Sequence, residues 1–168
     1  LQALEYGCLV TLFLAFITIA LRYHDIIVEA HEMLRHEAFT DPLTGALNRR
    51  GFDNASRREL SRARRSGAPL ALVHVDLDDF KQVNDTFGHQ VGDRALCQLV
   101  SVLQRSMRPS DVLCRFGGEE FVLMFPETSL QSATKAVARF LREFSAQTIP
   151  GTRRSMTFSA GVVVARPD

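Results

Sequence analysis

The chain has 168 residues, of which 46% are hydrophobic and 23% are charged, enough material for one domain of ordinary size. Its net charge of +1 argues against a nucleic-acid-binding surface, so no nucleic-acid partner is expected. The three cysteines, Cys8, Cys97 and Cys114, are odd in number and lack the spacing of metal ligands, which predicts reduced cytosolic thiols.

The first segment is strongly apolar. No charged residue occurs from Tyr6 to Leu21, and residues 9–21 are apolar apart from two threonines. A helix that is hydrophobic all round belongs in a membrane or in a protein core. At ~1.5 Å per residue the run spans roughly 24 Å, slightly less than the hydrocarbon core of a bilayer. We therefore expect residues 1–22 to be the end of a transmembrane helix, with a buried soluble helix as the alternative.

A more polar segment follows, and it begins with Arg22, which is consistent with the cytoplasmic side of a membrane. A pattern near heptad spacing then runs over about two heptads, at Ile27, Ala30, Leu34 and Glu37/Ala38. This pattern predicts a helical linker over residues 23–40, either a coiled coil or an amphipathic helix packed on its own domain. Pro42 ends it, because the residue before a proline avoids the α region.

Residues 49–66 have the pattern of a helix that is closed by Gly67 and Pro69. Several arginines cluster in it, and Glu59 interrupts them, so we interpret the cluster as a solvated helix face. The clustered residues are Arg57, Arg58, Arg62, Arg64 and Arg65.

A nearly continuous apolar run, Leu70 to Val75, predicts a strand covered on both faces, and the run ends abruptly in Asp76, Asp78 and Asp79. If this strand pairs beside the residues around Gly117, Asp76 comes close to two further acids, Glu119 and Glu120. Clustered carboxylates repel one another unless a cation is present. A divalent ion such as Mg²⁺ resolves the repulsion and keeps positions open for phosphate oxygens, which suggests phosphoryl or nucleotidyl transfer.

The connection from Phe80 to Asp93 is rich in polar residues and glycine, and we expect it to be a binding loop. Lys81 could meet phosphate as a point charge. Asn84 and Asp93 could read the edge of a base, and an aspartate favours guanine, which offers a pair of N–H donors. Asp93 could instead be a helix N-cap, and His89 is as readily a structural histidine.

The remaining elements complete an α+β pattern. Residues 93–107 form a helix with one apolar face, and the runs on either side of Gly117-Gly118 form a hairpin whose two central residues need positive φ. Thr128 or Ser129 caps a helix that runs to about Ser145, and residues 155–165 alternate as a strand. The order βαββαβ indicates a ferredoxin-like, palm-type core preceded by the N-terminal signalling helix and the transmembrane segment. An isolated acidic turn would be the plainer interpretation of the hairpin.

Several motifs, in this order and at these spacings, together resemble the GGDEF family of diguanylate cyclases over residues 41–168. They are Asp41-x-Leu43-Thr44-x-x-x-Asn48-Arg49-Arg50, Asp76-x-Asp78-x-Phe80-Lys81-x-x-Asn84-Asp85-x-x-Gly88-His89-x-x-Gly92-Asp93 and Gly117-Gly118-Glu119-Glu120-Phe121. The resemblance implies that two facing domains, each holding one GTP, condense the two nucleotides into cyclic di-GMP and release two pyrophosphates. It also implies a homodimer at the inner membrane of a bacterium, with the catalytic domain in the cytoplasm.

The resemblance implies a role for each matching residue. Mg²⁺ (or Mn²⁺) would be held by Asp76, Glu119 and the backbone carbonyl of Leu77, and the catalytic residues would be Glu119, which activates the 3′-hydroxyl, and Glu120. The remaining substrate contacts would come from Lys81 on phosphate, from Asn84, His89 and Asp93 on guanine, and from Gly118, where the nucleotide approaches the main chain.

Arg108 and Asp111 fit the family's product-inhibition motif, Arg-x-x-Asp, and the alternative for this pair is a surface ion pair of little energetic value. Family domains continue with a further helix and strand, so we expect a chain ending at Asp168 to fold less stably and to be impaired as a cyclase. Two other functions stay open. They are an inactive receptor for GTP or cyclic di-GMP and a different nucleotidyl-transfer enzyme on the same core.

Overall fold

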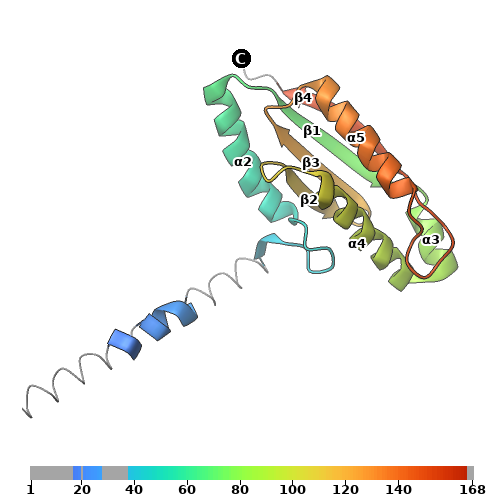
Figure 1. The fold of residues 1–168 in the computed structure, drawn as a ribbon, viewed down its shortest axis with the longest axis horizontal. Coiled ribbons are helices and arrows are strands. Elements are labelled where there is room, and N and C mark those ends of the chain that lie inside the picture. The colour runs from blue at the N-terminus through green and yellow to red at the C-terminus, as the bar shows by residue number, and fades with distance from the viewer. Residues whose placement is uncertain (1–16, 20, 28–37, 166–168) are drawn as a thin grey trace, which may run out of the picture. The chain divides into compact units, whose positions relative to one another are not determined.

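The computed structural model describes residues 17–19, 21–27 and 38–165, and the chain divides into two compact units, Leu1–Ala38 and Phe39–Asp168. The second unit is built on a four-stranded antiparallel sheet in the order β2-β3-β1-β4 (Figure 1). Its strands are β1 (Leu70–Leu77), β2 (Val112–Gly117), β3 (Glu120–Pro126) and β4 (Phe158–Ala165). Its helices are α2 (Arg49–Ser66), α3 (Phe80–Phe87), α4 (His89–Ser106) and α5 (Leu130–Ser145). The predicted βαββαβ order is confirmed, with two helices instead of one between β1 and β2.

One face of the sheet carries the main core. Alternate residues of β1 point to this face, and Ala71, Val73 and Val75 are completely buried there. Phe121 and Leu123 of β3 join them, and the apolar sides of α4 and α5 close the layer. Figure 1 shows these two helices side by side across the sheet. Burial of this face accounts for the continuous apolar runs in the sequence.

The opposite face is covered over β2, β3 and the start of β1, and Cys114, Val122 and Met124 are buried on it. There α2 packs through Ala63 on Leu70 and Met124. Further along β1, Leu72 is 37% exposed and His74 is exposed as well. The prediction of a strand covered on both faces is therefore wrong for the second half of β1, because α2 is aligned with the start of that strand. The uncovered part of β1 leads to Asp76.

The expected binding loop from Phe80 to Asp93 is in fact helical. Phe80 and Val83 are buried and anchor α3, and Gly88, at φ +85°, separates it from α4. The alternative of Asp93 as a helix N-cap is also wrong, because α4 already begins at His89 and Asp93 lies in its second turn. The apolar face predicted for this helix is confirmed.

Capping residues determine where α2 begins and ends and where α5 begins. The Asn48 side chain accepts from the Gly51 N–H at the start of α2, and Gly67, at φ +67°, ends the helix where it was predicted to end. Of the two candidate caps of α5, Ser129 is the one that accepts, from the Ser132 N–H. β4 begins later than expected, at Phe158, since Ser155 pairs only with Thr148 in an isolated bridge.

In the first unit, residues 17–19 and 21–27 are helical. Most of the predicted transmembrane segment (residues 1–22) and most of the predicted linker (residues 23–40) lie outside the described residues. Among those that are described, no helix has both the length and the apolar character needed to cross a membrane.

Candidate functional site

The glycine-rich hairpin forms as predicted, but its turn is shifted by one residue. Gly117 still pairs with Glu120, after an irregularity between Arg115 and Gly117, so the two turn residues are Gly118 and Glu119. Gly118 alone has the positive φ, +46°, and the expectation that both glycines need it is wrong. A Cβ built on Gly118 meets no atom within 4 Å, so the main chain at this turn is open to an approaching ligand.

The strand register brings the candidate catalytic acids together. Asp76 in β1 pairs directly with Glu120 in β3, and the Leu77 N–H donates to the Glu119 carbonyl oxygen at 3.4 Å. Residues directly opposite one another in an antiparallel pair share a face and have Cβ atoms about 4.5–5.5 Å apart. Glu120 also lies with its Oε1 3.6 Å from His74 Nε2, a neighbour that the sequence reasoning missed. The predicted proximity of Asp76 to the acids of the hairpin is confirmed at the level of the backbone.

Asp78 fastens the end of β1 to the beginning of β4. Its carboxylate accepts a hydrogen bond from Thr157 Oγ1 at 2.6 Å and another from Ser159 Oγ at 2.7 Å. Its backbone N–H donates to the Thr157 carbonyl at 3.1 Å. The end of β1 that carries Asp76 and Leu77 is therefore held against the beginning of β4. Sequence reasoning grouped Asp78 with the other acids but had no signal for these distant partners.

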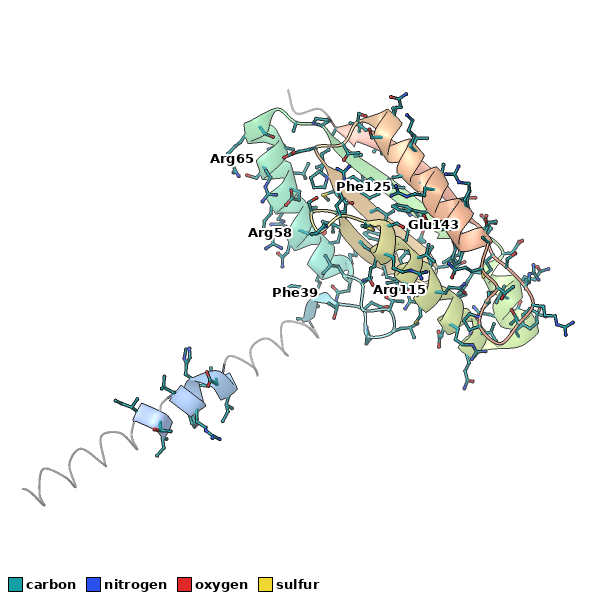
Figure 2. All side chains as sticks on the ribbon, in the orientation of Figure 1. Phe39, Arg58, Arg65, Arg115, Phe125 and Glu143 are labelled. Carbon is teal, nitrogen blue, oxygen red and sulfur yellow. The ribbon has the colours of Figure 1, made fainter. Side chains whose placement is uncertain are left out.

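Arg115, labelled in Figure 2, holds the turn of the hairpin through hydrogen bonds to its main chain. Its Nε and Nη2 donate to the Gly118 carbonyl at 3.0 and 2.8 Å, and its Nη1 donates to Asp41 Oδ1 at 3.0 Å. Burial raises the pKa of Asp41, but hydrogen bonds from Thr44 and Arg115, together with the charge of Arg115, outweigh burial and leave that pKa below its ordinary value. One ionised pair thus ties the start of the domain to the turn that carries Glu119.

The predicted base- and phosphate-binding residues lie on α3 and α4, directly beyond the end of β1. Lys81, His89 and Asp93 are exposed. Asn84 is different, because within the described part of the chain its Oδ1 is buried and has no hydrogen-bond partner. That oxygen lies against Gly92, where a Cβ would collide with it. The two helices therefore leave an unused acceptor beside the exposed polar groups.

The donor set suits a hard divalent cation. Asp76, Glu119 and the Leu77 carbonyl offer only oxygen atoms, which Mg²⁺ and Mn²⁺ prefer. Over residues 17–19, 21–27 and 38–165, no three His, Cys, Asp or Glu side chains converge as a metal-binding group. Mg²⁺ commonly uses one or two carboxylates and completes its shell with water and phosphate, so two carboxylates and a carbonyl fit it.

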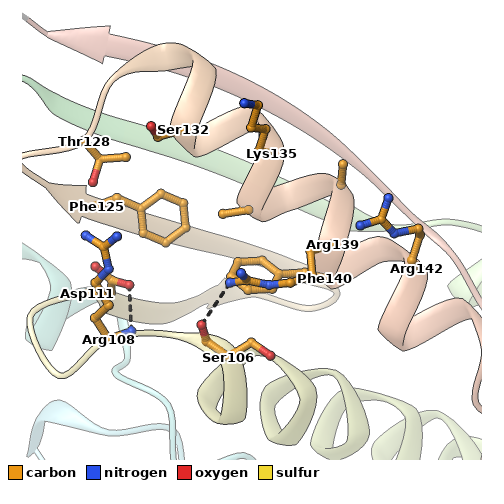
Figure 3. A pocket seen from close by; sticks show the side chains of 12 residues that line it. Ser106, Arg108, Asp111, Phe125, Thr128, Ser132, Lys135, Arg139, Phe140 and Arg142 are labelled. Carbon is orange, nitrogen blue, oxygen red and sulfur yellow. Dashed lines mark hydrogen bonds between the residues drawn. The ribbon is translucent and has the colours of Figure 1, made fainter.

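Arg108 and Asp111 are not part of this cluster, because they precede β2 and lie at the opposite end of that strand from the hairpin. The Arg108 N–H donates to Asp111 Oδ2 at 2.8 Å, and burial raises the pKa of Asp111 despite this bond. Both residues line a cavity of about 520 Å³ against α5 (Figure 3). Three further cations that the sequence reasoning missed also line it, namely Lys135, Arg139 and Arg142.

Known proteins with similar sequence and structure are consistent with this arrangement. The family described as "Diguanylate cyclase, GGDEF domain" matches residues 38–168. Diguanylate cyclase DgcP of Pseudomonas aeruginosa is 39% identical over 130 residues, which is 76% of this chain and 19% of that protein. Diguanylate cyclase DosC of Escherichia coli (strain K12) is 38% identical over 108 residues, 64% of this chain and 24% of that protein. The chain thus spans about a fifth to a quarter of the length of these curated relatives.

Among solved structures, the coiled coil and GGDEF domain of DgcB from Caulobacter crescentus, in complex with c-di-GMP, is similar over most of its length. The match has a TM-score of 0.83 at 29% identity and covers 91% of this chain and 83% of that one. The similarity therefore extends to the arrangement of strands and helices that carries the acidic cluster.

Proposed function

The chain belongs to the GGDEF family of diguanylate cyclases, and from that premise we propose that it joins two molecules of GTP into cyclic di-GMP and releases two pyrophosphates. The observation that carries the proposal is the register of β1 and β3, which sets Asp76 opposite Glu120 and the Leu77 N–H against the Glu119 carbonyl. The family's acids all stand at their positions, so an inactive receptor is not favoured.

In the proposed reaction Glu119 accepts the proton of a 3′-hydroxyl. The 3′-oxygen then forms a bond to the α-phosphorus of the second GTP, and the bond from that phosphorus to the pyrophosphate oxygen breaks. A second, equivalent step closes the ring. Mg²⁺ or Mn²⁺, held by Asp76, Glu119 and the Leu77 carbonyl, would neutralise charge on the phosphate oxygens. Lys81 would add a positive charge on the same side, and Glu120 would lie beside the reacting groups.

Guanine would be recognised from α3 and α4. Asp93 can accept from the amino group and the ring N–H of guanine, a donor pair that adenine lacks, and His89 lies one turn earlier on the same helix. The unpartnered Asn84 Oδ1 supports the assignment, because a ligand N–H would satisfy an acceptor that is otherwise buried alone. Gly118 has no side chain in the way of the nucleotide.

Feedback by the product would act through Arg108 and Asp111. Their cavity carries four cationic side chains and one acid, which suits the two phosphates of cyclic di-GMP. The distance of this cavity from the acidic cluster makes the effect a coupling between two sites, exerted through the arrangement of two domains in a homodimer. Attachment to a bacterial inner membrane through residues 1–22 completes the proposal.

Incubation of the purified protein with GTP and Mg²⁺, followed by identification of the product, tests the proposal. We expect cyclic di-GMP and pyrophosphate in a 1:2 ratio, and a rate per protein that rises with protein concentration if a dimer reacts. Glu119→Gln and Asp76→Asn should each lower the rate at least 100-fold, by removal of a general base or a metal ligand. The matched control is Glu127→Gln, an exposed acid beyond the far end of β3.

Three outcomes would contradict the proposal. Consumption of ATP in preference to GTP would indicate another nucleotidyl transferase. Binding of cyclic di-GMP without turnover by the wild-type protein would indicate a receptor. An equal loss of reaction rate in Glu119→Gln and Glu127→Gln would show that the acid of the hairpin has no special role in the reaction.

A further inference from the structure

α2 carries a positively charged surface that the proposed reaction does not use. The helix has 18 residues, RRGFDNASRRELSRARRS, with seven arginines and two acids. All seven arginines are exposed, and five of them lie on one side of the helix. We call these five the α2 stripe, and they are Arg50, Arg57, Arg58, Arg64 and Arg65. Figure 2 shows Arg58 and Arg65 on the side of α2 that faces away from the sheet.

The α2 stripe is continuous. At about 100° per residue its five arginines fall within an arc of about 120°, and at ~1.5 Å per residue they extend over about 22 Å. Asn54 and Ser61 lie inside the same arc, and neither acid of the helix does. The buried residues Ala55 and Ala63 lie outside it and hold the helix on the domain. A single orientation of α2 therefore presents all five guanidinium groups to one surface.

The other two arginines of α2 lie outside this arc, and each has a partner within the protein. Arg62 Nη1 lies 3.4 Å from Glu59 Oε2, and the Arg49 guanidinium lies 4.8 Å from the centre of the Phe116 ring. Within the stripe, Arg65 Nη1 donates to Ser61 Oγ at 3.0 Å, which leaves its remaining donors outward. The interpretation of the arginine cluster as a plain solvated face does not explain why the acids are segregated from it.

Charge is also divided unevenly between α2 and the rest of the chain. Seven arginines and two acids give α2 a net charge of +5, whereas the whole chain has +1, so the remainder carries −4. An anionic surface would attract α2 and repel the remainder, and would thereby orient the domain. The small net charge of the chain hides this separation.

We propose that the α2 stripe binds the anionic phospholipid surface of a membrane. An arginine guanidinium can donate two hydrogen bonds to the oxygens of one phosphate group. A cluster of four to eight basic residues on a helix is typical of sites that bind anionic lipids. Leu60, beside the stripe, is 42% exposed and can enter the headgroup region. Nucleic acid is less suited, because the arc holds no aromatic residue on which bases could stack.

Vesicle binding by the full chain tests the proposal. Partition of the protein is measured into vesicles of phosphatidylcholine with 30% phosphatidylglycerol and into vesicles of phosphatidylcholine alone. The neutral vesicles report any contribution of the apolar N-terminal segment, so the ratio of the two partition coefficients isolates the effect of lipid charge. Each arginine near an anionic surface is worth about fivefold in partition. Arg57→Gln/Arg64→Gln should therefore lower the anionic-to-neutral ratio by about 25-fold. The matched control, Arg105→Gln/Arg153→Gln, removes the same charge from exposed positions outside α2 and should leave the ratio within about twofold.

A second measurement covers the case in which the N-terminal segment holds the chain on both kinds of vesicle. A polarity-sensitive dye is attached at Asn54→Cys in a Cys8→Ser/Cys97→Ser background, where the buried Cys114 does not compete. We expect the emission of the dye to shift to the blue on anionic vesicles but not on neutral ones, and we expect 0.5 M salt to reverse the shift. An unchanged emission, equal ratios for the two double variants, or equally tight binding of duplex DNA at the same salt concentration would each overturn the proposal.

Discussion

Removal of Arg115 is expected to destabilise the domain more than removal of any surface ion pair. Arg115→Met keeps most of the side-chain volume and deletes every donor of the guanidinium. The Gly118 carbonyl then loses two hydrogen bonds, and Asp41 loses its charged partner at 3.0 Å. Both side chains of the pair are only 17% exposed, so water replaces the lost contacts incompletely.

The magnitude follows from these contacts. A hydrogen bond to a charged group contributes about 1.5–3 kcal/mol, and leaving a buried charge without any partner costs about 3–5 kcal/mol. Asp41 keeps two donors, the Thr44 N–H at 3.1 Å and Thr44 Oγ1 at 2.7 Å, so the larger penalty does not apply. The two bonds to the Gly118 carbonyl are exposed, so water can replace them, and the contact with Asp41 accounts for most of the loss. We expect the free energy of unfolding to fall by about 2–3 kcal/mol and the melting temperature by roughly 6–12 °C.

The same pair predicts a dependence on pH. Burial raises the pKa of Asp41, but the hydrogen bonds from Thr44 and Arg115 and the charge of Arg115 outweigh burial, so the folded-state pKa lies below the ordinary value of 3.8. A carboxyl with a depressed pKa stabilises the fold fully above its unfolded pKa, and the stabilisation is lost as the pH falls through the folded pKa. Without Arg115 the pKa of Asp41 rises, so the loss begins at a higher pH.

Urea unfolding at pH 7 and along a series down to pH 3 measures both effects. Arg62→Met is the control, because the Arg62 side chain is 61% exposed, and an ion pair with so exposed a partner contributes about 0–1 kcal/mol. An unfolding free energy for Arg115→Met equal to that of Arg62→Met would refute the reasoning. So would identical acid profiles for Arg115→Met and the wild-type protein.

Three further changes have defined outcomes. Gly118→Ala should cost about 1 kcal/mol because of its φ of +46°, whereas Gly117→Ala, with free space and no positive φ, should cost less than about 0.5 kcal/mol in urea unfolding. Burial raises the pKa of Cys114 to about 12, so a thiol reagent at pH 7.5 should modify it only as fast as the protein unfolds; prompt modification in the native state would contradict this. Phe140→Ala, which empties a 1% exposed position beside Phe125, should cost about 3–5 kcal/mol, and Leu130→Ala, 53% exposed, less than about 1 kcal/mol.

Much of the fold could be predicted because its signals are local. Asn48 and Gly67 lie at the two ends of α2, and the β-prone runs on either side of the glycine pair marked the two strands of the hairpin. The acids of the candidate site were equally visible, since Asp76 ends an apolar run and Glu119 lies in a tight turn. Each of these features depends on residues a few positions apart, for which the side chains and the backbone preferences suffice.

Contacts between distant segments were decided only in the folded protein. The sequence indicated a loop where α3 and the first turn of α4 form. That stretch is helical because burial of Phe80 and Val83 against the rest of the domain outweighs its polar composition. Arg115 and Asp41 lie 74 positions apart, and Asp78 and Thr157 lie 79 apart. No pattern along the chain signals such pairs, since their geometry exists only after the sheet has set its register.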